Sequence, residues 1–389
     1  MPDTPDLALQ PPTHAPAVTR WVEQIRSATA DRRGLRIAGG GTKRFFGEHL
    51  PATLEPLDTT CHTGIVAYEP TELVVTVRAG TPLQELDDAL QSKGQYLPFE
   101  PPHGGAAATV GGMVAAGLSG PARASVGAVR DFVLGAQLVN GRGEVLTFGG
   151  QVMKNVAGYD VSRVLAGSLG SLGVLAEVSL KVLPRPVAEA TLCFDLSQTE
   201  ALAQLARWRG QPLPLNASCW VHDDTQTPAR DLLFVRLRGA QAAVTAAQQR
   251  MLADAPGVAM DTESTAADWR ACAEQTLPFF AAPPSDQHGL WRLSVAPTAP
   301  ALPGASPTLI EWHGGLRWVW APLGDRAALQ QMAQHAGGHA TLYRAPTAQP
   351  DAPGRFGPLP LAERTLQRRL RQAFDPEGIF NPGIWGHDL

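Results

Sequence analysis

The most regular alternation of apolar and polar side chains lies between Val174 and Val182, where Glu177, Ser179 and Lys181 separate aliphatic residues. A period of two is that of a β-strand with one buried face. The sequence Pro-Arg-Pro at 184–186 follows at once and interrupts the pattern. The chain is therefore expected to divide there into two regions.

Before this boundary the pattern predicts both helices and strands. Residues 18–29 carry Trp21, Val22 and Ile25 at helical spacing. A second helix is expected to begin at Thr81, which has capping-box spacing to Gln84, and to end at Gly94. Strands are predicted at 35–38, 72–77, 132–139 and 144–148, the last two joined by the glycine-containing hairpin turn 140–143.

After the boundary, helical and strand patterns are interspersed. Helices are predicted at 200–209, 240–254, 325–336 and 361–374. Strands are predicted at 217–222, 232–237, 290–295, 309–312, 316–320 and 340–344. This order favours an α+β architecture in which helices cover an antiparallel sheet.

Length, net charge and cysteine spacing limit the classes of protein to which the chain can belong. A chain of 389 residues favours two domains, and a net charge of −4 gives no electrostatic footprint for nucleic acid. The four cysteines are widely spaced without a C-x-x-C pair, which fits a reducing compartment. Residues 1–16 are proline-rich and lack the apolar core of a signal peptide, so we expect a disordered lead.

Three segments of small residues stand out, at 38–43, 101–120 and 167–173. The central one has no charge between Gly104 and Ala122, but its six glycines and few large aliphatic residues argue against a membrane span. Glycine lets a backbone approach a ligand closely and adopt positive φ. Successive backbone N–H groups in such segments can converge on an anion. We therefore expect the three segments to close around one phosphate-bearing cofactor.

Several other sites are not supported. The chain has no G-x-G-x-x-G, no Walker A sequence, no H-E-x-x-H and no G-x-S-x-G. His335 and His339 have i, i+4 spacing, but Gly337 and Gly338 lie between them and favour a helix end. No metal site is predicted.

The small-residue segments occur together with Val129-Arg130-Asp131, the blocks 139–144 and 149–160, and Asn-Pro-Gly at 381–383. In this order they resemble the flavin-binding half of the vanillyl-alcohol oxidase/p-cresol methylhydroxylase (PCMH) superfamily. Within it, the chain is most similar to the smaller FAD-binding subunit of bacterial glycolate oxidase. The resemblance is strong over 35–184 and the last fifteen residues, and weak between them.

The resemblance implies an α+β fold with a two-subdomain PCMH-type FAD-binding domain at 17–186. A smaller α+β, ferredoxin-like cap domain would follow at 187–374. The C-terminal segment 375–389 would return to the FAD site.

The resemblance also implies FAD as cofactor. Non-covalent binding is expected because the first segment lacks the histidine that tethers FAD in some relatives, and His103 is the alternative tether. The residues expected beside the pyrophosphate are Gly39, Gly40, Gly41, Thr42 and Lys43, although Lys43 has the alternative of a solvated surface lysine. Those expected along the ribityl chain and isoalloxazine are Pro102, Gly104, Thr109, Gly111, Gly112, Gly117 and Gly120. Gly170, Gly173 and Val174 would lie by the adenine end, and Asn381 by the flavin.

The catalytic groups are not identified by the resemblance. Leu169 stands where many relatives have an acidic residue, and the H-x-G-D-G-x-x-H motif of related larger subunits is reduced to His335-Ala-Gly-Gly-His339. Weak candidates are Arg123, Arg130, Lys154, Tyr159 and Arg344, for each of which a structural or partner contact is the alternative.

Three functions are compatible with these features. The first is a subunit of a glycolate (2-hydroxy acid) dehydrogenase that works with a larger FAD subunit and an iron–sulfur subunit. The second keeps FAD but makes the chain a structural or electron-relay subunit. The third is a stand-alone flavin oxidase of a sugar or aldonolactone. The expected location is cytoplasmic, at the inner face of the membrane through partners, without a transmembrane segment of its own.

Overall fold

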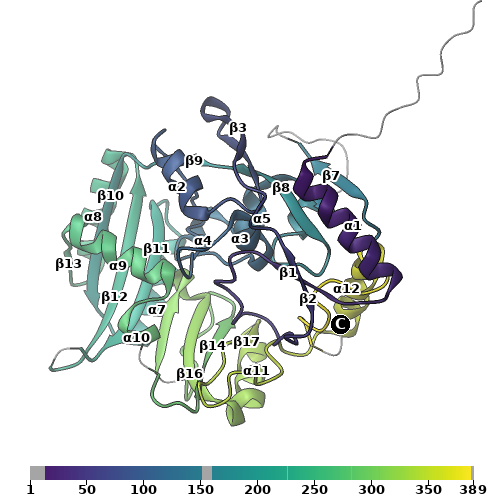
Figure 1. Ribbon diagram of the computed structural model, residues 1–389. Coiled ribbons are helices and arrows are strands. Elements are labelled where there is room, and N and C mark those ends of the chain that lie inside the picture. The colour runs from purple at the N-terminus through teal and green to yellow at the C-terminus, as the bar shows by residue number, and fades with distance from the viewer. Residues whose placement is uncertain (1–13, 151–159, 226, 282, 306, 387–389) are drawn as a thin grey trace, which may run out of the picture.

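The computed structural model describes residues 14–386 except 151–159, 226, 282 and 306. Two antiparallel sheets lie on opposite sides of the molecule, with α3 (Val110–Ala116), α4 (Arg123–Val126) and β1 (Leu35–Ala38) between them (Figure 1). The segments that carry most glycine therefore run between the two sheets.

The first sheet has five strands. Their order is β3 (Ile65–Glu69), β4 (Val74–Arg78), β8 (Val174–Lys181), β6 (Val133–Val139) and β7 (Val145–Gly149). β8 lies in the centre, so both of its faces are covered rather than one. A bulge at Ala176 turns Val174 and Ala176 towards α1 (Pro16–Ala30), while Val178 and Leu180 enter the larger core on the other face.

The remaining elements of this region surround the sheet. β1 pairs in parallel with β2 (Glu55–Asp58), and β5 (Gln95–Tyr96) pairs with β9 (Leu183–Pro184). The short helices α2 (Leu83–Gln91), α5 (Val129–Phe132) and α6 (Val161–Val164) complete it. The predicted capping box of α2 was wrong: Thr81 instead bonds Gly64 and Arg78, and the helix begins at Leu83.

The second sheet has eight strands. Their order is β13 (Gly257–Ala259), β10 (Ala188–Asp195), β12 (Arg230–Gly239), β11 (Leu215–Asp223), β15 (Thr308–Glu311), β16 (Leu316–Pro322), β14 (His288–Ser294) and β17 (His339–Arg344). The first four strands with two helices form a β-α-β-β-α-β unit in the order 4-1-3-2. The last four repeat this strand order and join the first unit through β11 and β15.

Helices cover the two faces of this sheet unequally. One face packs against α7 (Gln198–Arg209), α8 (Gln241–Asp254) and α11 (Arg326–His335). The other, here called the inner face, packs against α9 (Thr262–Glu274), α10 (Pro278–Ala281) and the end of α3. The fold is thus the expected α+β fold, but α9 and β10 were not predicted.

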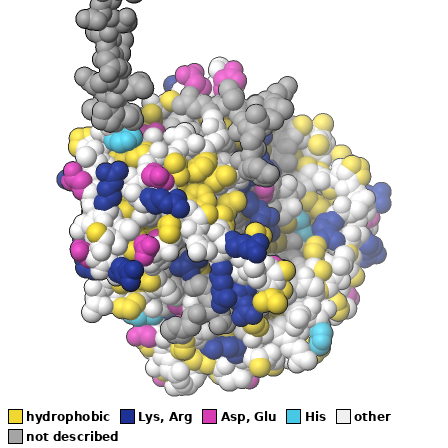
Figure 2. All heavy atoms as spheres, turned by 90° about the vertical axis from the view of Figure 1, so that its right-hand side faces the viewer, with side chains coloured by type: hydrophobic (Ala, Val, Ile, Leu, Met, Phe, Trp, Pro, Cys, Tyr) yellow, Lys and Arg dark blue, Asp and Glu magenta, His cyan; other side chains and the backbone are white. Residues whose placement is uncertain are grey.

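The last helix, α12 (Leu361–Phe374), lies against the five-stranded sheet, where Phe374 packs on Phe148 of β7. Figure 2 shows this side of the molecule, where apolar side chains are bordered by lysine and arginine. We propose domain limits at Pro186 and at the start of α12, so that α12 belongs with the C-terminal segment that returns to the first region.

Candidate cofactor site

A cavity of about 290 Å³ lies where the first glycine segment, α3 and the C-terminal segment meet. Its lining combines residues far apart in the sequence. Eight of the predicted cofactor residues line it: Gly39, Gly40, Gly41, Thr42, Lys43, Thr109, Gly112 and Asn381. The expected convergence of the segments is therefore present in the fold.

The glycines of the first segment are required by close backbone approach. A Cβ added to Gly40 would lie 1.5 Å from the carbonyl oxygen of Ala107, and one added to Gly39 would lie 2.8 Å from Thr109 Oγ1. Gly41 has a φ of +71°, where a side chain is strained. The first and second segments thus pack backbone to backbone and form one wall.

The wall offers donors to an anion. Within the described residues, the backbone N–H groups of 39–43 have no protein acceptor. Arg36 and Arg44 also line the cavity, and Arg36 Nε is buried without a partner. Unpaired N–H groups and guanidinium groups are the donors that a diphosphate accepts. These residues fit the pyrophosphate of a dinucleotide.

Lys43 is not a solvated surface lysine. Its Nζ donates to the carbonyl oxygen of His103 at 2.8 Å. Burial lowers the pKa of Lys43 to about 8, against the opposing attraction of Glu274. Lys43 therefore carries a positive charge at the cavity wall at neutral pH.

Asn381 joins the C-terminal segment to both other parts of the site. Its Oδ1 accepts from the N–H of Ile37 at 2.9 Å, and its Nδ2 donates to the carbonyl oxygen of Leu169 at 2.7 Å. A Cβ on Gly170 would lie 2.7 Å from that Nδ2. The third segment is thus held at the cavity by Asn381 and contributes Leu169 to its lining.

The other predicted cofactor residues do not line this cavity, and their contact with the cofactor stays a prediction. Gly111, Gly117 and Gly173 lie where a Cβ would meet Ala79, Gly167 and the carbonyl oxygen of Val139. Val174 is fully buried in β8. Pro102, Gly104, Gly120 and Gly170 lie in the connections around the cavity.

His103 is directed elsewhere. Its Nε2 pairs with Asp87 of α2 at 3.0 Å, and this partner raises the pKa of the imidazole. The backbone N–H groups of His103 and Gly104 donate to the carboxylate of Glu274 at the end of α9. His103 is thus engaged by protein groups on both sides and does not line the cavity.

The predicted catalytic candidates separate in space. Lys154 and Tyr159 lie outside the described residues. Arg130 is exposed over 64% of its side chain on the surface. Arg344 lies over the ring of Phe45, and Arg123 lies 4.3 Å from the centre of the Trp312 ring. Of the three candidates that the structure describes, Arg123 and Arg344 therefore face the junction between the two regions and Arg130 does not.

Sequence reasoning missed the inner-face residues that complete this junction. Arg292 of β14 lies 5.1 Å from the same Trp312 ring, so two guanidinium groups stack on one indole. Within the described residues the guanidinium groups of Arg123 and Arg292 have no hydrogen-bond acceptor. Burial lowers the pKa of Arg292 to about 10, and the charge of Arg123 adds to this. We call Arg123, Trp312 and Arg292 the arginine stack.

The turn that places Trp312 is strained. Trp312 and His313 have φ of +54° and +53°, in the left-handed region. Trp312 Nε1 donates to the carbonyl oxygen of Gly120, while the His313 ring lies between Ser125 and Ser218. Contacts from both regions thus hold the indole between the two arginines. The sequence predicted that strands 309–312 and 316–320 are joined through His313, Gly314 and Gly315, but it did not predict the left-handed backbone at Trp312 and His313.

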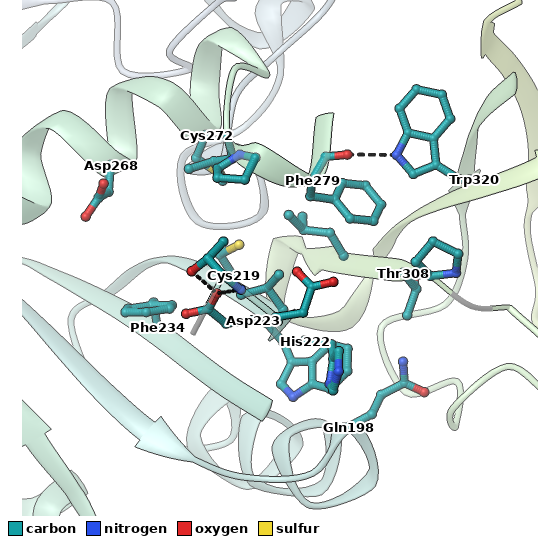
Figure 3. A pocket seen from close by; sticks show the side chains of 18 of the residues that line it. Gln198, Cys219, His222, Asp223, Phe234, Asp268, Cys272, Phe279, Thr308 and Trp320 are labelled. Atoms are coloured by element: carbon teal, nitrogen blue, oxygen red, sulfur yellow. Dashed lines mark hydrogen bonds between the residues drawn. The ribbon is translucent and has the colours of Figure 1, made fainter. Parts of the chain in front are cut away.

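A second cavity of about 980 Å³ lies on the inner face beside α9 and α10. Figure 3 shows Cys219, Cys272, Phe279 and Trp320 among the side chains that line it. None of the residues of the glycine segments lines it. It is therefore separate from the candidate cofactor site.

Two further searches cover the described part of the chain. No group of three or more potential metal-ligating side chains was found there, and His335 and His339 lie on α11 and β17. No helix in the same residues is long and apolar enough to cross a bilayer.

Comparison with known proteins identifies the class of this site. Residues 17–149 match the FAD binding domain family. Solved structures of alkyldihydroxyacetonephosphate synthase share the fold, with a TM-score of 0.62 in one crystal form at 14% identity, over 93% of this chain and 73% of that one. The cofactor is FAD.

Sequence relatives extend the match. Glycolate oxidase subunit GlcD of Bacillus subtilis is 32% identical over 49% of this chain, which spans 40% of that relative. Glycolate oxidase subunit GlcE of Escherichia coli is 44% identical over 93% of this chain and 95% of its own length. The chain therefore belongs to the glycolate oxidase subunit GlcE family, FAD-dependent oxidoreductases related to 2-hydroxy-acid dehydrogenases.

Proposed function

We propose that this chain is the FAD-binding subunit of a glycolate (2-hydroxy acid) dehydrogenase complex that oxidises glycolate to glyoxylate. Its partners would be a larger FAD-binding subunit and an iron–sulfur subunit, at the inner face of the cytoplasmic membrane. The relatives named as glycolate oxidase subunits and D-lactate or D-2-hydroxyglutarate dehydrogenases support this class of substrate.

One observation supports a substrate that bears a carboxylate. Among the described residues neither guanidinium group of the arginine stack forms an ion pair with a carboxylate, so two like charges lie together in a position that an external anion would stabilise. A carboxylate is the group that a guanidinium recognises with two parallel hydrogen bonds. We therefore assign the carboxylate of the 2-hydroxy acid to Arg123 and Arg292.

The residues of the cavity suit the retention of FAD without a covalent bond. The N–H groups of 39–43, Arg36 and Lys43 would hold the pyrophosphate, and Asn381 would fix the third segment against it. Bound FAD supplies an acceptor for the two electrons that the hydroxyl-bearing carbon loses when glycolate becomes glyoxylate.

Tyr343 of β17 is a buried polar group on the inner face that interacts electrostatically with Arg292. Its hydroxyl is buried near Gln275 without a hydrogen bond of acceptable geometry. Burial raises the pKa of Tyr343 to about 12, so the phenol keeps its proton at neutral pH. In this role Tyr343 donates a hydrogen bond to a substrate oxygen and is not the base.

The second candidate function keeps FAD and places the turnover of the hydroxy acid in the larger subunit. It is favoured by the surroundings of the arginine stack, where Glu311 is already bonded to Trp318 and Cys272. Glu311 is therefore not free to take the hydroxyl proton, and the imidazole of His313 is likewise bonded, to Ser125 and Ser218.

Anaerobic mixing with glycolate separates the two functions. The FAD-loaded isolated chain is expected to lose its absorbance near the flavin maximum, and Arg292→Met is expected to raise the glycolate concentration needed at least about tenfold, or ~1.4 kcal/mol. Arg130→Met, on the surface, is the matched control. Bleaching that occurs only when the larger subunit is added would support the second function and end the first.

A further inference from the structure

The inner face of the eight-stranded sheet carries a buried carboxyl group that the proposed function does not use. Glu311 ends β15 and is 3% exposed. Its Oε2 accepts from Trp318 Nε1 at 2.5 Å, and its Oε1 accepts from the thiol of Cys272 at 3.2 Å. No cation pairs with it among the described residues.

The strand register explains these contacts. Glu311 lies directly opposite Cys219 of β11, and β16 places Trp318 two residues beyond the partner of Glu311. Cys272 of α9 lies over both, and Figure 3 shows the two cysteines at the wall of the larger cavity. A carboxyl group is thus enclosed by two thiols and an indole.

The same register brings Glu311 close to the arginine stack. Arg292 is the cross-strand partner of Trp318, and Trp312 follows Glu311 in the chain. The charge of Arg292 acts on Glu311 and favours its ionised form, although the two do not form an ion pair. The charge of Glu311 can therefore change the net charge near the arginine stack, although Glu311 itself would not contact an anion bound there.

We propose that Glu311 is a proton-linked positioning residue, whose charge state sets the affinity of the arginine stack for a carboxylate. The inference rests on the proposed function, because it needs an anion at Arg123 and Arg292. When Glu311 is neutral, the stack keeps its full positive charge. When Glu311 is ionised, its negative charge offsets that of Arg292 and weakens anion binding.

The pH range follows from the surroundings of Glu311. Burial is the largest influence and raises its pKa to about 7, against the hydrogen bonds from Trp318 and Cys272. The charged or titratable groups facing it are Arg292 from β14, Tyr343 from β17, Cys219 from β11, Cys272 from α9 and Glu100 from the first region. Contact with Cys219 is the largest influence on the pKa of Cys272 and, together with burial, raises it, so this thiol stays protonated through neutral pH. Of the carboxyl and thiol groups here with a shifted pKa, Glu311 is thus the one that changes charge near pH 7.

The test is to measure the dissociation constant of oxalate from the FAD-loaded chain by titration calorimetry at pH 6 and at pH 8. Oxalate is fully ionised in this range, so its own charge is constant. The wild-type chain is expected to bind oxalate about tenfold more weakly at pH 8 than at pH 6. Glu311→Gln keeps an oxygen acceptor for Trp318 but has no charge, and it is expected to bind equally at both pH values with the affinity of the wild type at pH 6. Glu311→Asp is expected to restore a pH dependence.

The matched control is His339→Gln, which removes another titratable group that senses Arg292. It is expected to keep the wild-type pH dependence. Equal pH dependence in the wild type and Glu311→Gln would overturn the role of Glu311 and leave the proposed function standing. Absence of oxalate binding at both pH values in an FAD-loaded chain would overturn both.

Discussion

The two regions of the molecule build their parts of the site by opposite means. In the first region, glycines bring backbone against backbone, as at Gly40 and Ala107, and the exposed donors are main-chain N–H groups. In the eight-stranded region, large side chains such as Trp312 and Arg292 carry the polar groups into the junction. The first region therefore tolerates little change in volume, whereas the second is sensitive to charge.

The largest effect is expected from a substitution that disrupts the backbone packing of the first region. Gly40→Val places side-chain atoms on the carbonyl oxygen of Ala107, so the first two segments cannot pack and the cavity wall is lost. We expect the purified variant to retain less than about a tenth of the wild-type FAD, measured by absorbance after gel filtration. Gly324→Ala is the control, because nothing lies within 4 Å of an added Cβ there. Normal FAD content in Gly40→Val would show that this close approach is not needed.

The next effect concerns the contact between the regions. Glu100 accepts from Arg236 at 2.7 Å and from Arg238 at 2.7 Å, and the Arg236 side chain is only 2% exposed. Glu100→Ala leaves a buried guanidinium without its carboxylate and is expected to lower the free energy of unfolding by about 3 kcal/mol in urea denaturation. The control Asp195→Ala breaks the exposed pair with Arg230, with little expected change. Equal effects of the two variants would contradict a dominant role for the buried pair.

In the eight-stranded region, the turn that contains Trp312 and His313 is expected to make the free energy of unfolding depend on pH. Burial lowers the pKa of His313 to about 4, below its ordinary value of 6.5. Between pH 6.5 and pH 4, His313 is protonated in the unfolded chain but stays neutral in the folded chain. The free energy of unfolding therefore falls as the pH drops through this range. Relative to His313→Asn, the wild type is expected to lose up to about 3 kcal/mol over this range in paired denaturation curves. Parallel curves would mean that His313 is protonated in the folded chain.

The smallest expected effect lies at the C-terminal segment. Asn381→Ala removes the hydrogen bonds to Ile37 and Leu169 and is expected to cost about 2 kcal/mol of unfolding free energy. The FAD affinity should fall with it, because the third segment loses its attachment to the cavity. Asn140→Ala, in the hairpin turn between β6 and β7, is the control for lost turn hydrogen bonds and should leave FAD affinity unchanged. A stable Asn381→Ala with lower FAD affinity would place its role in the cofactor alone.

The same contrast explains what the sequence could predict. Local patterns such as the period-two alternation in β8 or the strand 35–38 depend on neighbouring residues, and the structure confirms these elements. The cavity could be expected because glycines cluster in three short segments, where they indicate close approach of the backbone. Arg292 and Trp312 could not be found this way, because their meeting with Arg123 depends on the register of β14, β15 and β16. Gly111 and Gly117 show that a glycine in such a segment need not line the cavity. At both positions a side chain is excluded by close packing against other parts of the protein, Ala79 and Gly167.

Hydrogen–deuterium exchange of the chain with and without FAD tests the convergence of the segments most directly. Without FAD, the amides of 39–43 should exchange quickly, because they have no protein acceptor. On addition of FAD, exchange should slow at least about tenfold together in 39–43, in the region around Thr109 and in the region around Leu169. Slowing confined to one of these segments, or none in a chain that has bound FAD, would contradict the site described above.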